Sequence, residues 1–97
     1  MHPDTARLHN ISNGEWVWVE NWLGKCRLKA KVTPVVPPWM VMAAHGWWFP
    51  EDDGAENSLH GVWKSNINVL TDDDPDICNP ISGGWPLRAF LCKVYKV

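Results

Sequence analysis

The sequence His45-Gly46-Trp47 has residue types well suited to binding a ligand. Glycine lets a ligand approach the backbone closely. The imidazole of His45 can donate or accept a hydrogen bond, and the indole of Trp47 adds a flat face and an N–H donor. Asn66 and Asn68 contribute two side-chain amides, one residue apart. Such amides suit a fused heterocycle edged with donors and acceptors, for example a pterin or a guanine. The alternative is that both asparagines only cap turns of their own backbone.

Other reactive side chains are too scattered to form a recognisable catalytic or metal site. The three cysteines, Cys26, Cys78 and Cys92, contain no C-x-x-C pair, so a zinc ribbon or iron–sulfur site is disfavoured. The acidic run at residues 72–76 lacks the spacing of an EF-hand loop and is interpreted as a solvated turn. No phosphate-binding or nucleophile motif is present. We therefore expect a binding element without catalytic residues or metal ligands of its own.

Length and composition favour one small globular domain over residues 1–97. Nine Lys and Arg against eleven Asp and Glu give a net charge of -2, which disfavours nucleic-acid binding. No apolar run approaches the roughly 18 residues of a membrane-spanning helix, so membrane insertion is not expected. The first residues lack the pattern of a secretory signal, and we expect a cytoplasmic location, although an export signal of a longer parent protein would lie outside this chain.

Eight tryptophans stand out in a chain of 97 residues. Each tryptophan can bury about 150–250 Å² of surface, whereas a domain of this size buries only about 60–70% of the surface of its unfolded chain. We therefore expect some of the rings to be exposed, or to face a planar ligand, a partner domain or a partner subunit.

The local sequence signals predict mainly β structure with one short helix and long loops, resembling a small barrel or part of one. The expected elements are a helix at residues 2–9, strands at residues 15–20, 25–33, 39–44 and 87–97, a hairpin loop at residues 21–24 and a surface loop at residues 51–61. Basic and apolar side chains alternate along the second strand. Its basic side is expected to be solvated, unless it lines a cleft where it could meet an anion.

The order and spacing of several motifs resemble a known family over nearly the whole chain. These motifs lie at residues 2–6, 11–19, 24–34, 45–48, 66–71, 79–83 and 93–97. Together they are similar to the C-terminal molybdopterin-dinucleotide-binding domain of the dimethyl sulfoxide reductase family, which comprises molybdenum and tungsten oxidoreductases.

The resemblance implies a double-psi β-barrel that caps a cofactor of two molybdopterin guanine dinucleotides. The molybdenum or tungsten would be ligated by a residue outside this chain. The positions that match the family's cofactor-contacting segments are His45, Gly46, Trp47, Asn66, Asn68 and Arg88. At Arg88, a guanidinium could meet a phosphate or the edge of a heterocycle.

The chain also departs from the family pattern. Pro38-Trp39 stands where the family usually has a glycine turn, and the family domain normally begins several tens of residues earlier with a further strand. We therefore expect a partial double-psi β-barrel, cut from or encoded without that strand. Its open strand edges could pair with the remaining domains of a parent enzyme or with another copy of the chain.

The sequence thus predicts a cofactor-binding fragment of an anaerobic molybdenum or tungsten oxidoreductase, inactive by itself. One alternative is a tryptophan-rich β module that binds carbohydrate or another planar ligand, which a fluorescence titration with oligosaccharides would detect. Another is an interaction subunit that completes its barrel with a partner protein.

Overall fold

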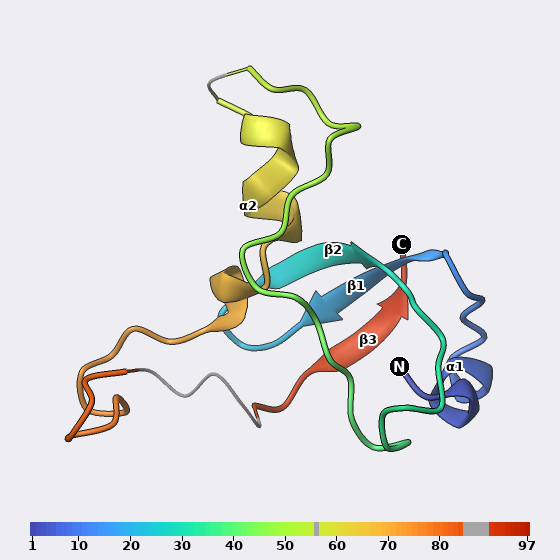
Figure 1. Ribbon diagram of the computed structural model, residues 1–97, viewed down its shortest axis with the longest axis horizontal. Coiled ribbons are helices and arrows are strands. Elements are labelled where there is room, and N and C mark those ends of the chain that lie inside the picture. The colour runs from blue at the N-terminus through green and yellow to red at the C-terminus, as the bar shows by residue number, and fades with distance from the viewer. Residues whose placement is uncertain (56, 85–89) are drawn as a thin grey trace.

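A three-stranded antiparallel sheet lies at the centre of the molecule in the computed structural model, which describes residues 1–55, 57–84 and 90–97 (Figure 1). The strands are ordered β2-β1-β3, so β1 pairs with both of the others. The elements are α1 (Pro3–Leu8), β1 (Trp16–Glu20), β2 (Lys25–Lys29), the 3-10 turn η1 (Leu59–Gly61), α2 (Val62–Ser65), the 3-10 turn η2 (Ile67–Leu70) and β3 (Lys93–Lys96).

The N-terminal helix α1 is confirmed close to its expected bounds. His2 caps it, because His2 Nδ1 accepts a hydrogen bond from the Asp4 backbone N–H at 3.1 Å. Pro3 occupies the first turn, where the N–H that it lacks has no helical acceptor. The carboxylate of Asp4 lies near the positive end of the helix dipole. Local chemistry alone therefore accounts for where this helix begins.

The hairpin of β1 and β2 is also confirmed, with Trp16 opposite Lys29 and Glu20 opposite Lys25. Its loop is closed by Asn21, whose Oδ1 accepts the N–H groups of Leu23 and Gly24 at 2.9 and 3.3 Å. Side-chain acceptors of this kind stabilise tight turns. The alternating pattern and the turn residues thus set both strands and their register.

Strand β2 ends at Lys29, four residues before the expected end. The following backbone groups bond elsewhere: the Val32 N–H donates to Asn13 Oδ1 at 2.9 Å, and the Thr33 N–H donates to the Met1 carbonyl at 2.9 Å. Since these donors are satisfied by the N-terminal segment, they do not extend the ladder.

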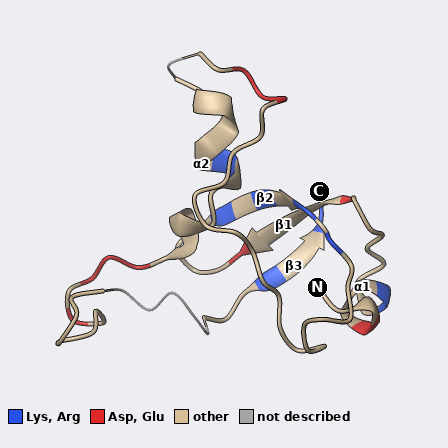
Figure 2. Ribbon diagram, in the orientation of Figure 1, with Lys and Arg blue, Asp and Glu red and all other residues tan. Residues whose placement is uncertain are grey.

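The basic side chains of β2 cover the aromatic side chains of β1. The Arg27 guanidinium lies 4.4 Å from the Trp16 ring centre, and Lys25 Nζ lies 4.5 Å from that of Trp18. Figure 2 shows basic positions along β2 in blue. Cation–π contacts of this type are favourable, so the basic side of β2 is partly packed rather than simply solvated.

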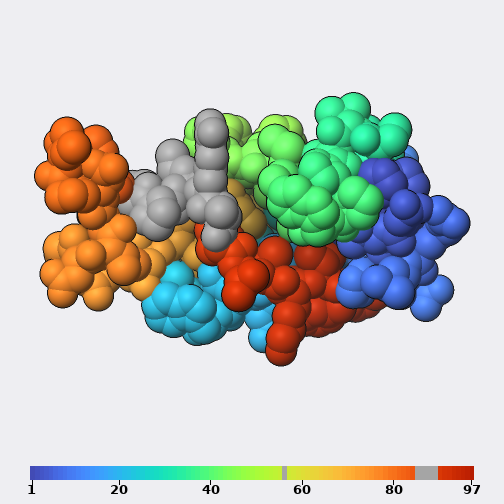
Figure 3. All heavy atoms as spheres, turned by 90° about the horizontal axis from the view of Figure 1, so that it is seen from below, coloured from blue at the N-terminus to red at the C-terminus, as the bar shows by residue number. Residues whose placement is uncertain are grey.

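The strand expected at residues 39–44 is wrong. The chain turns at Pro37, where the Met40 N–H donates to the Pro37 carbonyl at 3.1 Å, and it continues without strand pairing. Trp39 is 79% exposed. The turn that precedes this segment lies beside α1 (Figures 1 and 3), where Thr5 Oγ1 donates to the Pro38 carbonyl. An apolar run forms a strand only if a neighbour accepts its hydrogen bonds, and no described strand pairs with this one.

The last strand is shorter than expected. β3 pairs with β1 from Val17 opposite Lys96 to Glu20 opposite Lys93, while residues 87–89 of the expected strand lie outside the described residues. Three strands are therefore described rather than four or so, and the mainly β architecture with long loops is confirmed.

Two small buried clusters of the described residues lie on the valine side of β1. One contains Ile11, Val17 and Ala30. The other contains Val19, Cys26 and Leu70. Asn21 Nδ2 donates to the Leu70 carbonyl at 2.7 Å and thereby ties η2 to the hairpin.

The molecule is more extended than its length requires. Its radius of gyration is 14.5 Å, with extents of 39 × 36 × 21 Å, whereas a compact domain of this length has a radius of about 12–13 Å. Exposed tryptophans accompany this shape, as the sequence predicts: Trp22, Trp39, Trp47, Trp48 and Trp63. Over the described ranges, no helix is long and apolar enough to cross a membrane.

Burial of Cys26 generates a test of the core. Desolvation, with a smaller contribution from Cys92, raises the pKa of the fully buried Cys26 thiol to about 11. Only the thiolate reacts with alkylating reagents. Cys26 labelling at pH 8 should therefore be at least about 100-fold slower than that of a thiol of ordinary pKa, and its rate should rise up to about pH 11. Mass spectrometry of iodoacetamide-treated protein measures this, with Cys78 as the internal reference. Levelling of the Cys26 rate near pH 9 would contradict the assigned environment.

Candidate functional site

The two sequence segments predicted to bind a ligand lie next to each other. The Gly46 N–H donates to Asn66 Oδ1 at 3.2 Å, although the two residues are 20 positions apart. Ser65, directly before Asn66, places its Oγ 3.4 Å from the Trp47 carbonyl. The hydrogen bond between Gly46 and Asn66 joins the His45–Trp47 turn to the Asn66–Asn68 segment, and we call these two segments together the candidate site.

Asn66 organises this site through its side-chain oxygen. It is the N-cap of η2, where Oδ1 accepts the Asn68 N–H at 3.0 Å in addition to the Gly46 N–H. The capping alternative considered for this residue therefore holds for its oxygen. The side-chain nitrogen donates to none of the described residues and is the part of the amide left for a ligand.

Asn68 is held by its backbone rather than by its side chain. Its carbonyl accepts the Thr71 N–H at 3.1 Å and the Thr71 hydroxyl at 2.7 Å. The side chain is exposed and has no hydrogen-bond partner in the described part of the chain. Both the donor and the acceptor of this amide can therefore face a ligand.

The turn at Gly46 is open towards the surroundings. Gly46 has a φ of +66°, a conformation that favours glycine, and no atom lies within 4 Å of the position a Cβ would take. His45 and Trp47 on either side are exposed, Trp47 by 49%. A flat ligand can therefore approach this backbone together with an imidazole and an indole.

Ser65 is a site residue that sequence reasoning missed. It is fully buried, and its Oγ donates to the Gly61 carbonyl at 2.9 Å, four residues earlier in the chain. A serine that bonds back to position i−4 is a recognised local pattern, but its approach to Trp47 depends on the tertiary fold. Ser65 is therefore a buried neighbour of the site that packs under the Trp47 backbone.

The candidate site offers neutral hydrogen-bonding groups: an imidazole, an indole N–H and two amides. Such groups match the edge of a pterin or guanine better than they match a metal ion. In the described ranges, no group of three or more His, Cys, Asp or Glu side chains is placed to hold a metal. Arg88, the remaining predicted contact, lies outside the described residues.

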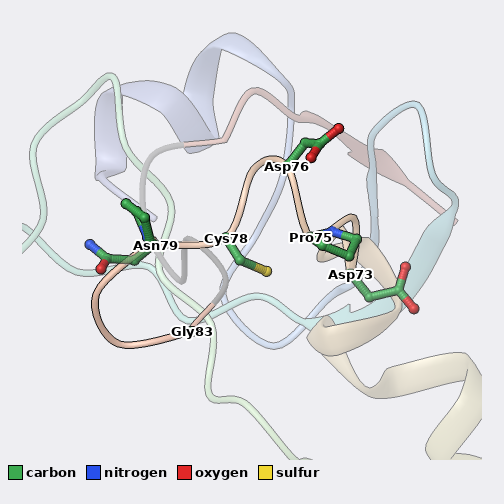
Figure 4. A pocket seen from close by; sticks show the side chains of 7 residues that line it. Asp73, Pro75, Asp76, Cys78, Asn79 and Gly83 are labelled. Carbon is green, nitrogen blue, oxygen red and sulfur yellow. The ribbon is translucent and has the colours of Figure 1, made fainter.

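A separate hollow lies in the loop at residues 71–84, at one end of the molecule (Figure 3). Its lining includes Asp73, Asp76 and Cys78 but no residue of the candidate site. Figure 4 shows the two carboxylates pointing in different directions rather than towards a common centre. The hollow therefore supplies no converging ligands and leaves the candidate site as the better binding surface.

Comparison with known proteins identifies the family. Residues 1–90 match the family model described as "Molydopterin dinucleotide binding domain". The chain belongs to the molybdopterin dinucleotide-binding domain family. The resemblance inferred from the motifs is thereby confirmed, and so is molybdopterin dinucleotide as the cofactor of the family. The match also favours the cofactor-binding interpretation over the carbohydrate-binding alternative.

Several curated proteins are similar to this molybdopterin dinucleotide-binding domain over almost its whole length. Acetylene hydratase of Syntrophotalea acetylenica is 36% identical, and the alignment covers 99% of this chain and 13% of that protein. Dopamine dehydroxylase of Eggerthella lenta is 35% identical, and the alignment covers 99% of this chain and 9% of that protein. Dimethyl sulfoxide reductase of Haemophilus influenzae is 31% identical, and the alignment covers 100% of this chain and 11% of that protein. The chain thus spans about a tenth of the length of these relatives.

A solved structure supports the same assignment. The domain superposes on acetylene hydratase from Pelobacter acetylenicus with a TM-score of 0.86 and 32% identity, covering 100% of this chain and 14% of that one.

The double role of Asn66 gives a test of the site geometry. Asn66→Ala removes the acceptor of two backbone N–H groups and should lower the free energy of unfolding by about 1–2 kcal/mol. Asn66→Asp retains an acceptor oxygen and should recover most of this loss. Urea denaturation followed by tryptophan fluorescence measures both variants. Equal destabilisation by alanine and aspartate would show that Oδ1 does not pin the turn.

Proposed function

We propose that this chain caps a molybdopterin guanine dinucleotide and binds the edge of its heterocycle through the candidate site. The contact between the Gly46 N–H and Asn66 Oδ1 carries the proposal, because it gathers the predicted groups on one surface. The family assignment supplies the cofactor class. The guanine form of the dinucleotide and the roles of individual residues are our inference.

Each residue of the site would have a distinct task. The Asn68 amide would pair with a donor and an acceptor of the heterocycle, and Asn66 would donate through its side-chain nitrogen. His45 would hydrogen-bond to a polar group of the ligand, and Trp47 would offer its ring face or its indole N–H. Arg88 would meet a phosphate or a ring edge, on the basis of the family resemblance alone. None of these residues is proposed to be catalytic.

When bound, the cofactor carries molybdenum or tungsten and supplies the redox chemistry. The chain itself would bind and orient the cofactor, while the metal would be ligated outside residues 1–97. This division of labour is common where a cofactor performs the difficult chemistry. We infer that the chain acts as the C-terminal part of a cofactor-binding domain in a larger cytoplasmic oxidoreductase.

The sheet is proposed to form part of a double-psi β-barrel completed by the rest of that enzyme. In the order β2-β1-β3, each outer strand has one partner among the described residues. Strands with free edges tend to acquire further partners. The remaining domains of the enzyme would pair with these edges, and in their absence a second copy of the chain could do so.

Asn68→Ala tests the proposed function directly. The variant should fold normally, because the side chain bonds to no described residue. It should bind the cofactor roughly 5- to 150-fold more weakly, since leaving a buried partner unsatisfied costs about 1–3 kcal/mol. The pterin released per protein chain, measured by fluorescence after oxidation, gives the occupancy in the native gene product.

A matched control is Asn57→Ala, which removes an exposed amide from outside the candidate site. It should leave the cofactor content unchanged. Wild-type occupancy in the Asn68→Ala protein would remove this residue from the binding surface, and equal losses in both variants would make the effect non-specific.

A further inference from the structure

The chain between the two halves of the candidate site forms a closed loop at residues 49–61, here called the 49–61 loop. Its ends meet where the Phe49 N–H donates to the His60 carbonyl at 3.1 Å. Trp47 lies two residues before the loop and Asn66 lies five residues after it. This Phe49–His60 contact, here called the loop base, is therefore connected by short segments to both halves of the site.

The 49–61 loop is attached to the sheet through one connected set of side chains. Phe49, which is 6% exposed, packs edge-on against Trp16 with ring centres 4.6 Å apart. The Arg27 guanidinium lies over the same Trp16 ring, and its Nη2 is 3.5 Å from Asp52 Oδ2. The loop and α2 stand beside β2 (Figure 1). Arg27 therefore links the loop carboxylate to the aromatic contact on β1.

Arg27 and Asp52 depend on each other for pairing. Their side chains are 29% and 28% exposed. Arg27 Nε and Asp52 Oδ2 are both buried and have no hydrogen-bond partner in the described parts of the chain. A poorly solvated charge that loses its counter-ion is costly. No other described group forms an ion pair with Arg27 or Asp52. Removing one of the two therefore leaves the other without a counter-ion and weakens the attachment of the loop.

The loop is closely packed around Asp52. A Cβ at Gly61, whose φ is +69°, would lie 2.1 Å from Asp52 Oδ2. The Asp52 carbonyl accepts a hydrogen bond from His60 Nδ1 at 3.0 Å. Leu59 and His60 also have positive φ values of 45° and 54°. Such conformations persist only where the surrounding contacts hold them, and the hydrogen bond between the His60 ring and the Asp52 carbonyl is one of those contacts.

We propose that Arg27 and Asp52 are positioning residues that hold the two halves of the candidate site together. Neither residue belongs to the site itself. They fix the 49–61 loop against Trp16, and the loop base in turn holds the Gly46 N–H within reach of Asn66. The consequence for cofactor affinity rests on the proposed function, whereas the geometric effect does not.

Amide hydrogen exchange in the native gene product, prepared without cofactor, tests the geometric effect. Asp52→Ala should accelerate exchange at Gly46 and Asn68 by about tenfold or more, because local opening becomes easier. Exchange at Val17 and Val19 in β1 should remain unchanged. A purely structural role of Asp52 would accelerate exchange throughout the sheet as well.

Two further variants probe the pair. Arg27→Gln should accelerate exchange at least as much, because it also removes the cation over Trp16. The double variant should exchange no faster than Arg27→Gln alone, because Asp52 then has no pair left to lose. Asp52→Asn keeps the side-chain shape and provides the measurement if the alanine variant does not accumulate. The matched control is Glu51→Ala, which removes an exposed pair of 3.1 Å with Lys29 from the neighbouring position. Exposed pairs contribute little, so this control should behave as wild type.

Unchanged exchange at Gly46 in both Asp52 variants, or equal acceleration in β1, would overturn the inference. Cofactor content, measured in the same variants, separates it from the proposed function. Faster exchange with normal cofactor content upholds the positioning role and counts against cofactor binding at the candidate site. The opposite outcome is also possible: Asn68→Ala loses cofactor, while Asp52→Ala keeps normal amide exchange and normal cofactor content. That result upholds the proposed function and overturns the positioning role.

Discussion

The alternation of side chains along β1 determines how the rest of the molecule is arranged. Val17 and Val19 point to one face and contribute to both core clusters. Trp16 and Trp18 point to the other, where the cationic side chains of β2 cover them. Because β1 also pairs with a strand along each edge, both of its faces and both of its edges are in contact with other elements. The 49–61 loop is attached through Trp16 and η2 through Val19, so the two halves of the candidate site meet beside β2.

Much of the N-terminal half was predictable because its signals are local. A capping residue with Pro3 defines α1, an alternating pattern defines β1, and Asn21 with Gly24 defines the hairpin loop. The predicted strand at residues 39–44 failed for the opposite reason, since strand formation depends on a neighbour that no local pattern reveals. The short turns at residues 59–70 have no periodic pattern and are held by Gly61 and by burial of Leu70.

The candidate site was predictable in part. The chemistry of His45, Asn66 and Asn68, together with the family resemblance, identified the groups that suit a heterocycle. The sequence did not reveal that Asn66 would use its oxygen internally and leave only its nitrogen for a ligand. Nor did it distinguish Arg27 from the other cations of β2, because its pairing with Asp52 depends on a contact across 25 residues of chain.

The short dimension of the molecule, 21 Å, has a consequence for how a large ligand could be held. Packed sheets lie about 10 Å apart, so this dimension corresponds to about two layers of structure. In the described part of the chain, a body this thin has no interior deep enough to enclose a dinucleotide. On the proposed function, such a ligand would lie across an outer surface, and shielding it from water would require a second wall from another part of a larger assembly.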